Sequence, residues 1–327
     1  MTRCLVVSAV AACCSATPAF AQAPATQKFP THPIRFIVPY PPGGTSDVLS
    51  RGLAERLTKV FGQPVVLDFR PGAAGNLGTD LAARAKPDGY TWLLATVGPF
   101  AANVTLNAGK LPFDPARDFE PLSLLAASPL ILVTHPSMPI RNVAELVRLA
   151  KSRPGQLNYA TPGAGTANHL VMETFNRLTG VSIVHIPYKG TAQSLVALIG
   201  GDIELLVGQI PSTGAAIAAK RVRPLAISGG KRSKVLPDVP TFAQAGVNGV
   251  ELVSWFGVAV PAGTPKDIVS RAAGEIAAAV RSPELNALYV SAGLEPETST
   301  PAEYAAFIRG EVTRWGKAVR DAGLISQ

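Results

Sequence analysis

The chain is poor in cysteine, and the few cysteines it has exclude several kinds of site by their position. Of 327 residues, only Cys4, Cys13 and Cys14 carry a thiol, and all three lie near the N-terminus. The rest of the chain therefore has no disulfide, no cysteine ligand for zinc or an iron–sulfur cluster, and no thiol nucleophile. Such a chain must be stabilised by burial of apolar side chains, and its length favours two domains over one.

Long apolar runs and concentrated basic charge are also missing. After the N-terminal segment, no apolar run approaches the roughly 20 residues that a membrane-spanning helix needs, so we expect a soluble mature protein. The formal net charge is +8, but the basic residues are scattered and aromatic residues make up only 6% of the chain. Nucleic-acid-binding proteins usually gather positive charge on one face and interleave aromatic side chains. The composition therefore argues against a nucleic-acid partner and leaves a solvated basic surface or a field that favours anionic solutes.

The N-terminus has the pattern of a secretory signal peptide. Arg3 precedes an apolar stretch over Leu5–Ala12, and Ala19–Ala21 forms a small-x-small cleavage pattern. We therefore predict that residues 1–21 are removed on export. The alternative is lipoprotein processing at Cys13, because small residues precede that cysteine too.

Short apolar runs alternate with segments of helical periodicity along the rest of the chain. Strands separated by helices predict an α/β fold with a mainly parallel sheet flanked by helices on both faces. Such sheets bind ligands at the carboxyl ends of their strands, where helix N-termini point into a crevice. The predicted strands are Ile34–Pro39, Val65–Phe69, Thr91–Thr96, Leu157–Ala160, Ile183–Ile186, Ile203–Val207, Arg223–Ser228 and Phe256–Val260.

Helix start signals are clearest near the C-terminus. Thr300 and Glu303 form a capping box with proline at the first helical position, and Thr264-Pro265 precedes another helix. After the first strand, apolar residues recur at helical spacing and predict a helix there. These positions are Val48, Leu49, Leu53, Leu57 and Val60.

Two strand-to-helix junctions share one composition. The first strand is followed by PPGGTSD at residues 41–47, and LNYA at residues 157–160 is followed by TPGAGTANH. A helix N-terminus has unpaired backbone N–H groups and the positive end of the helix dipole, and glycine lets an anion approach them closely. Neither junction ends in the Gly-Lys-Ser/Thr of a phosphate loop. We therefore predict two carboxylate-binding junctions, one in each domain, that clamp a ligand between them.

Each junction also has a purely structural interpretation. Glycine-rich turns between strands and helices are common, and Ser, Thr or Asp caps need no ligand. Thr45 and Ser46 can cap the helix or donate to an oxyanion, and Asp47 can cap it or accept from a ligand amine. The second junction offers Gly163, Gly165, Thr166, Asn168 and His169 for the same purposes.

Motifs for catalysis or metal binding are not found. The histidines His32, His135, His169 and His185 form no His-x-x-x-His or His-Glu-x-x-His pattern, and no Gly-x-Ser-x-Gly elbow occurs. The carboxylates show no local acid–base pairing. We expect His185 to be a satisfied core or edge residue, and only His169 to lie near a ligand. The sequence thus predicts no catalytic residue, no metal site and no cofactor.

The junctions belong to a longer series of motifs that resembles one family along the mature length. It resembles the tripartite tricarboxylate transporter substrate-binding proteins, the TctC-like or Bug receptors. The matching segments, in order, are PIRFIVPYPPGGTSDVLSR, FGQPVVLDFRPGAAGNLGTDLAARAKPDGYTWLLAT, LPFDPARDFEPLSLLA, PGQLNYATPGAGTANHL, VHIPYKGTAQSLVALIGGDIELL, LPDVPTFAQAG and SWFGVAVPAGTP.

This resemblance implies a periplasmic type II binding-protein fold. Two α/β domains would close on a small carboxylated solute: an organic acid, an amino acid or an aromatic carboxylate. The protein would act as a monomer and deliver this solute to a membrane permease of the same transporter class. Domain 1 would hold residues 22–126 plus 241–327 and domain 2 residues 127–240, with strand-like segments between them as the hinge. Two alternatives stay open: a receptor that signals to a membrane sensor, and a periplasmic hydrolase or isomerase with scattered catalytic groups.

In the family, the main carboxylate contacts come from the first and second junctions, largely through backbone N–H groups and ordered water. Gln209 stands where relatives often carry Asp or Asn, which removes a possible charge. We expect core packing for Trp255 and solvation for Lys189, whereas Phe100 lines the pocket or belongs to the core. The predicted ligand-binding set is Tyr40, Pro42, Gly43, Gly44, Thr45, Ser46, Asp47, Asn76, Thr96, Val97, Thr161, Gly163, Gly165, Thr166, His169, Tyr188 and Gln209.

Overall fold

The computed structural model describes residues 29–325, so the predicted signal peptide lies outside the described residues. The helices are α1 (Thr45–Phe61), α2 (Asn76–Ala83), α3 (Asn103–Leu106), α4 (Val143–Ser152), α5 (Ala167–Thr179), α6 (Thr191–Gly200), α7 (Ile210–Ala218), α8 (Lys266–Arg281), α9 (Pro283–Ser291) and α10 (Pro301–Asp321). The strands are β1 (Ile34–Val38), β2 (Val65–Phe69), β3 (Thr91–Thr96), β4 (Phe119–Thr134), β5 (Asn158–Thr161), β6 (Val184–Pro187), β7 (Leu205–Gln209), β8 (Arg223–Ile227), β9 (Val253–Pro261) and β10 (Glu295–Pro296).

The strands form one path in the order β2-β1-β3-β9-β4-β7-β5-β6, with β8 and β10 pairing with β4 beside it. The outer pairs β1–β2, β1–β3, β5–β6 and β5–β7 are parallel, whereas the pairs made by β4 and β9 are antiparallel. Helices separate the parallel strands, which confirms the predicted α/β class. The antiparallel pairs arise because β4 and β9 run back through the middle of the path.

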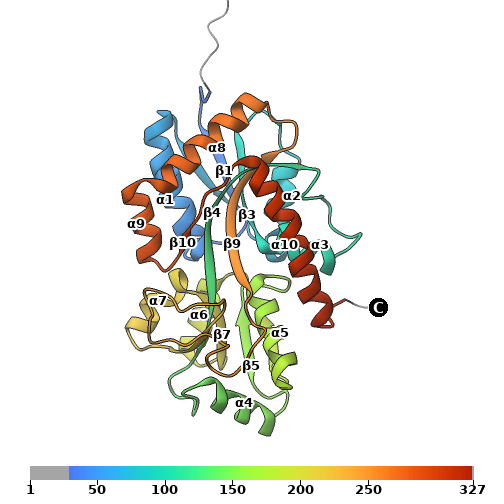
Figure 1. Cartoon of the computed structure of the whole chain (residues 1–327), viewed down its shortest axis with the longest axis vertical. Helices are drawn as coiled ribbons and strands as arrows, with labels where there is room; N and C mark the ends of the chain where they lie inside the picture. Colours follow the sequence, from blue (N-terminus) through green and yellow to red (C-terminus); the bar gives the residue numbers. More distant parts are fainter. Residues whose placement is uncertain (1–28, 326–327) are drawn as a thin grey trace, which may run out of the picture.

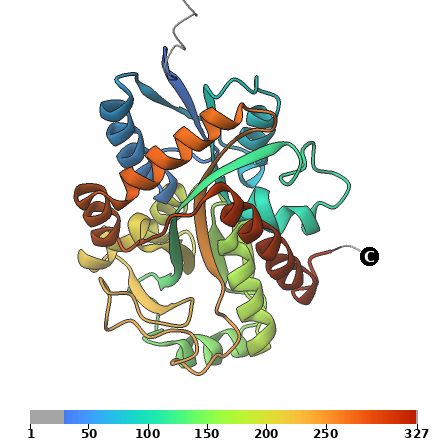
Figure 2. The same ribbon diagram turned by 45° about the horizontal axis from the view of Figure 1, so that its top comes forward.

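Two lobes are visible in Figure 1, and β4 and β9 connect them. The first lobe holds β1–β3, α1–α3 and α8–α10, and the second holds α4–α7 with β5–β8. One apolar cluster lies within the first lobe, another within the second, and a third continues through both. The C-terminal helix α10 packs against β4 and also contacts α5 of the second lobe (Figure 2).

Strand β4 is the main element that was not predicted. Its first part, Phe119–Pro129, pairs with β9, and its last part, Leu130–Thr134, pairs with β7. Proline donates no ladder hydrogen bond and usually marks an edge or a bulge, so Pro121 and Pro129 argued against a central strand in the sequence. The register shifts directly after Pro121, where the ladder accommodates it.

The predicted helix starts agree with the structure. The Thr300 hydroxyl accepts from the Glu303 backbone N–H at 3.2 Å, and the Glu303 carboxylate accepts from the Thr300 N–H at 2.8 Å, which is the predicted capping box. Helix α8 begins directly after Pro265, while the Thr264 hydroxyl donates to the Pro261 carbonyl at 2.7 Å. These signals are local, so a short stretch of sequence suffices to specify them.

A buried carboxylate joins β9 to α10. The indole N–H groups of Trp255 and Trp315 both donate to one oxygen of Glu311, at 2.9 and 2.7 Å. All three side chains are buried, and Trp255 belongs to the core as expected. The other carboxylate oxygen faces the half-exposed Arg314 at 3.5 Å. Glu311 thus satisfies two buried donors that have to be paired when the helix packs on the strand.

Replacing Glu311 with leucine should lower the free energy of unfolding by about 2–5 kcal/mol, because each buried N–H left without an acceptor costs about 1–3 kcal/mol. Urea unfolding followed by circular dichroism measures the change. Glu311→Gln keeps an acceptor oxygen and should lose less. Arg314→Leu should cost under about 1 kcal/mol, because its ion pair is half-exposed. Equal losses for Glu311→Leu and Arg314→Leu would show that the indole bonds contribute little.

Candidate functional site

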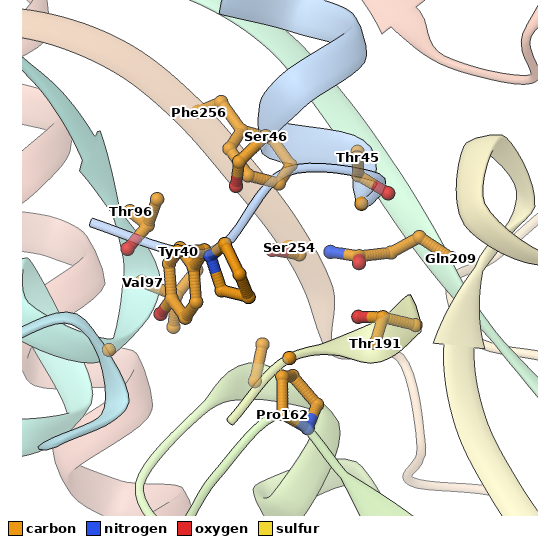
Figure 3. Close-up of a pocket in the computed structure, with 15 residues that line it drawn as sticks. Tyr40, Thr45, Ser46, Thr96, Val97, Pro162, Thr191, Gln209, Ser254 and Phe256 are labelled. Atoms are coloured by element: carbon orange, nitrogen blue, oxygen red, sulfur yellow. The ribbon is translucent and has the colours of Figure 1, made fainter. Parts of the chain in front are cut away.

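A cavity of about 40 Å³ lies between the two lobes, at the carboxyl ends of β1, β3, β5 and β7 (Figure 3). By volume it has room for about three water molecules. None of the residues that line it, all within the part of the chain that the structure describes, has a charged side chain. They are Tyr40, Pro41, Gly44, Thr45, Ser46, Thr96, Val97, Gly98, Pro162, Ala167, Gly190, Thr191, Gln209, Ser254 and Phe256.

The first junction places the N-terminus of α1 at the cavity wall. Gly44 is the N-cap residue in an extended conformation, and no side chain caps the helix. Thr45 and Ser46 form the first helical turn, line the cavity and are buried. Within residues 29–325 the Thr45 hydroxyl has no hydrogen-bond partner. The positive end of a helix of 17 residues is thus left open to an anion in the cavity.

Asp47 stabilises this junction from behind. Its Oδ2 accepts from the Gly43 N–H at 2.9 Å, and its Oδ1 lies 2.6 Å from Nε of Arg51. Gly43 has φ +87°, a left-handed conformation that glycine adopts without strain, and this allows the turn to reach Asp47. Since Asp47 does not line the cavity, its negative charge is directed away from an anion at the helix end.

The second junction lines the cavity with residues other than those predicted. Thr166 caps α5 by accepting from the His169 N–H, and its hydroxyl donates to the Gly163 carbonyl at 2.7 Å. Pro162 and Ala167 line the cavity, while Thr166 and Gly165 lie behind them. The capping hydroxyl therefore has a structural role, and the cavity wall is made of backbone and small apolar side chains.

Two histidines pack behind the second junction. The Gly165 N–H donates to Nδ1 of His169 at 3.3 Å, and the His169 ring lies 4.2 Å from that of His185. Burial lowers the pKa of His169 to about 3 and that of His185 to about 4, so both rings are neutral at neutral pH. His185 Nε2 is 2.6 Å from the Thr161 hydroxyl. Neither histidine lines the cavity, and both shape the loop that does.

Glycine is found where the lobes come closest. A Cβ on Gly190 would overlap the Pro41 ring, and one on Gly163 would contact Ala74. A Cβ on Gly98 would meet the carbonyl oxygens of Ala74 and Gly165. Glycine backbone of one lobe thus lies directly against small side chains and backbone of the other, and side chains on these glycines would hold the lobes apart.

A second cavity of about 260 Å³ shares Tyr40 and Pro162 with the first, so these two side chains form the partition between them. It is also lined by residues 72–75, by Gly163 and Ala164, and by Tyr188 and Lys189. The Tyr40 hydroxyl donates to the Ala74 carbonyl at 3.0 Å, and burial raises the pKa of Tyr40 to about 12. The partition is therefore a neutral phenol at physiological pH.

The predicted set divides into two groups. Tyr40, Gly44, Thr45, Ser46, Thr96, Val97 and Gln209 line the first cavity, and Gly163 and Tyr188 line the second. The others line neither: Pro42, Gly43, Asp47, Asn76, Thr161, Gly165, Thr166 and His169. Asn76 accepts from the Asn103 amide at 3.0 Å, and Phe100 is buried against Phe119.

Several lining residues were not predicted. Gly190 and Thr191 open α6 after a strand, and the same glycine–threonine pattern that marked the other junctions could have identified them. Ser254 and Phe256 alternate along β9, and nothing local in the sequence shows which face of the strand meets the cavity. Pro41, Gly98, Pro162 and Ala167 are neighbours of predicted residues.

Two kinds of feature are not found within residues 29–325. No group of three or more His, Cys, Asp or Glu side chains in these residues is placed to hold a metal ion. No helix in the same range combines the length and the apolar character that crossing a membrane requires.

Comparison with known proteins places this site in a family. The family model described as the tripartite tricarboxylate transporter family receptor matches residues 49–324. Among curated relatives, Protein BugT of Bordetella pertussis is 36% identical over 324 residues, which cover 99% of this chain and 98% of BugT.

Solved structures show the same fold. The periplasmic binding protein BugD is 31% identical with a TM-score of 0.87, over 91% of this chain and all of BugD. Rpa4515 of R. palustris, solved with adipate, is 36% identical with a TM-score of 0.88, over 90% and 98% of the two chains. MatC from Rhodopseudomonas palustris, solved with malate, is 29% identical with a TM-score of 0.85, over 89% of this chain and all of MatC.

The match along nearly the whole described chain agrees with the glycine-lined cavity between two α/β lobes and with its lack of charged or metal-binding groups. The fold is that of a periplasmic binding protein. The chain belongs to the TctC (Bug) family of tripartite tricarboxylate transporter receptors, which are non-enzymatic solute-binding proteins.

Proposed function

We propose that this protein captures a small organic carboxylate between its two lobes and delivers it to a membrane permease of the tripartite tricarboxylate transporter class. The observation that carries the proposal is the uncapped N-terminus of α1 at the wall of a cavity without charged side chains. A carboxylate there would accept hydrogen bonds from backbone N–H groups and interact favourably with the helix dipole. The adipate and malate bound to related structures support this chemistry.

The small size of the cavity implies that binding involves movement of the two lobes. About 40 Å³ is too little for a dicarboxylate with its full set of atoms. A solute therefore binds while the lobes are further apart, or it extends past Tyr40 and Pro162 toward the second cavity. Ligand then favours the closed arrangement in proportion to its differential affinity for that arrangement.

The boundaries of the moving parts follow the lobes. We assign residues 22–126 and 253–327 to one domain and residues 127–252 to the other, with β4 and β9 as the connections that bend. The second boundary lies later than residue 240, where the sequence placed it, because Phe242 packs against Phe175 of α5 and its N–H donates to the Ile227 carbonyl. We further propose that residues 1–21 direct export to the periplasm and that the mature protein acts as a monomer. Ligand contact is assigned to the predicted residues that line the first cavity.

A carboxylate should raise the melting temperature of the mature protein in a thermal-shift screen of mono- and dicarboxylates, because a ligand that binds only the folded state adds RT ln(1 + [L]/Kd) to its stability. At 100 times Kd this amounts to about 2.7 kcal/mol. Calorimetry on the strongest compounds gives the affinity. If no carboxylate shifts the melting temperature and none gives binding heat, the proposed function is wrong.

Gly44→Val should weaken carboxylate binding about 10-fold or more while leaving the fold intact. An added Cβ at Gly44 meets no heavy atom within 4 Å, so the new side chain projects into open space beside the N–H groups of α1. Loss of glycine at the N-cap costs the unliganded protein at most about 1 kcal/mol. Gly230→Val, at an exposed glycine that is equally unobstructed, is the matched control. Unchanged affinity in Gly44→Val would move the carboxylate away from α1.

Gly190→Ala should reduce ligand affinity because it keeps the lobes from closing fully, and not because it removes a contact to the ligand. The new methyl group would overlap Pro41 of the opposite lobe, whereas the extended backbone at Gly190 tolerates alanine. We expect a larger radius of gyration of the liganded protein by small-angle X-ray scattering and a several-fold weaker Kd. Gly310→Ala, at an exposed site with free space, should change neither. A Gly190→Ala protein that closes and binds like the wild type would contradict the close approach.

A further inference from the structure

Gln209 is a buried residue at the wall of the first cavity, and its side-chain amide is open to that cavity. Gln209 ends β7, opposite Leu130 of β4, and only 6% of its surface is exposed. Its backbone carbonyl accepts from the hydroxyls of Ser212 and Thr213, both at 2.9 Å, which holds the main chain in place. The amide itself has no hydrogen-bond partner among residues 29–325, and Figure 3 shows it pointing toward the middle of the cavity. An amide that faces the cavity without a bond to protein is available to a ligand there.

Two hydroxyls lie on the same side of the cavity. Thr191 begins α6, Ser254 belongs to β9, and both are buried beside the Gln209 amide (Figure 3). In the described part of the chain, neither hydroxyl makes a hydrogen bond to protein. The wall formed by Gln209, Thr191 and Ser254, which we call the amide wall, is therefore polar, neutral and free to bond to a ligand.

Helix dipoles make this wall electropositive. Helix α6 has Gly190 as its N-cap and α7 has Gln209, and no side chain caps either helix. Their positive ends thus meet the cavity on the side of the amide wall. No charged side chain lines the cavity, and the nearby carboxylate of Asp47 is engaged by Gly43 and Arg51. A ligand ammonium group placed here would lose its hydration without meeting a counter-charge.

We infer that Gln209 determines specificity by donating its amide N–H groups to an oxygen acceptor at the end of the ligand remote from α1. This inference rests on the proposed function, since it assumes a carboxylate at the α1 end. Its consequence is that the protein selects dicarboxylates, whose second carboxylate meets the amide wall, over amino acids of the same chain length that place an ammonium group there instead.

Matched ligand pairs test this selectivity, because the two members of each pair have equal chain length and differ only in whether the remote end is a carboxylate or an ammonium group. The pairs are succinate and 3-aminopropanoate, glutarate and 4-aminobutanoate, and adipate and 5-aminopentanoate, and calorimetry measures both members of each. We expect the wild-type protein to bind the dicarboxylate of the best pair at least about 10-fold more tightly than its amino acid partner, because a hydrogen bond to a charged group contributes about 1.5–3 kcal/mol.

Substitutions at Gln209 separate recognition from structure. Gln209→Met keeps the approximate size and removes the donors, so it should weaken dicarboxylate binding about 10-fold and reduce the selectivity. Gln209→Glu places a negative charge on the amide wall, so it should weaken dicarboxylate binding further and strengthen amino acid binding. Gln193→Glu adds the same charge at an exposed position of α6 and should change neither affinity. A merely structural role for Gln209 would lower both affinities together.

The possible outcomes are distinct. A wild-type protein that binds no carboxylate rejects the proposed function, and with it this inference. A wild-type protein that binds dicarboxylates, with variants at Gln209 that bind both ligand classes as the wild type does, rejects the inference and leaves the proposed function standing. Tighter binding of the amino acid by the wild-type protein also rejects the inference. Opposite changes for the two ligand classes in Gln209→Glu support it.

Discussion

Close approach of glycine backbone to small side chains and carbonyl groups of the opposite lobe is the constraint on which this cavity depends. The lobes meet at Gly190 and Pro41, at Gly163 and Ala74, and at Gly98, and at each of these points a Cβ on the glycine would contact or overlap its neighbour. The absence of larger side chains at these points leaves the helix N-termini open to the cavity, beside the neutral polar side chains that line it. The site then presents dipoles and N–H groups that are fixed by the fold, and these need no charged side chain to attract an anion.

The titratable side chains near the cavity lie behind its neutral lining. Asp47 and Arg51 form an ion pair behind the first junction, and His169 and His185 stay neutral behind the second because burial lowers their pKa. Titratable groups thus hold the loops in shape without putting charge into the cavity. A ligand is met by groups whose orientation is already set, so less conformational entropy is lost on binding.

Local features were predictable from the sequence, and features that depend on distant pairing were not. The capping box at Thr300 is specified within a few residues, as are the strands Val65–Phe69 and Thr91–Thr96. The sequence also offered side-chain caps for α1, and the structure shows that its N-cap is Gly44 and that no side chain caps it. The role of Asp47 was ambiguous because the same side chain can cap a helix or bind a ligand. Strand β4 was missed because its prolines are tolerated only through a register shift against β9, and the faces of Ser254 and Phe256 follow from that same pairing.

The link between Trp255 and Glu311 has an optical consequence. Trp255 lies between Ser254 and Phe256, which line the cavity, and its indole is held on the opposite face of β9 by a carboxylate of α10. The chain has only three tryptophans, so a large share of its intrinsic fluorescence comes from a ring attached to the strand that forms the cavity floor. The proposed closure of the lobes would bend β9 beside that ring, and the intrinsic fluorescence of the protein would then report closure without an added label.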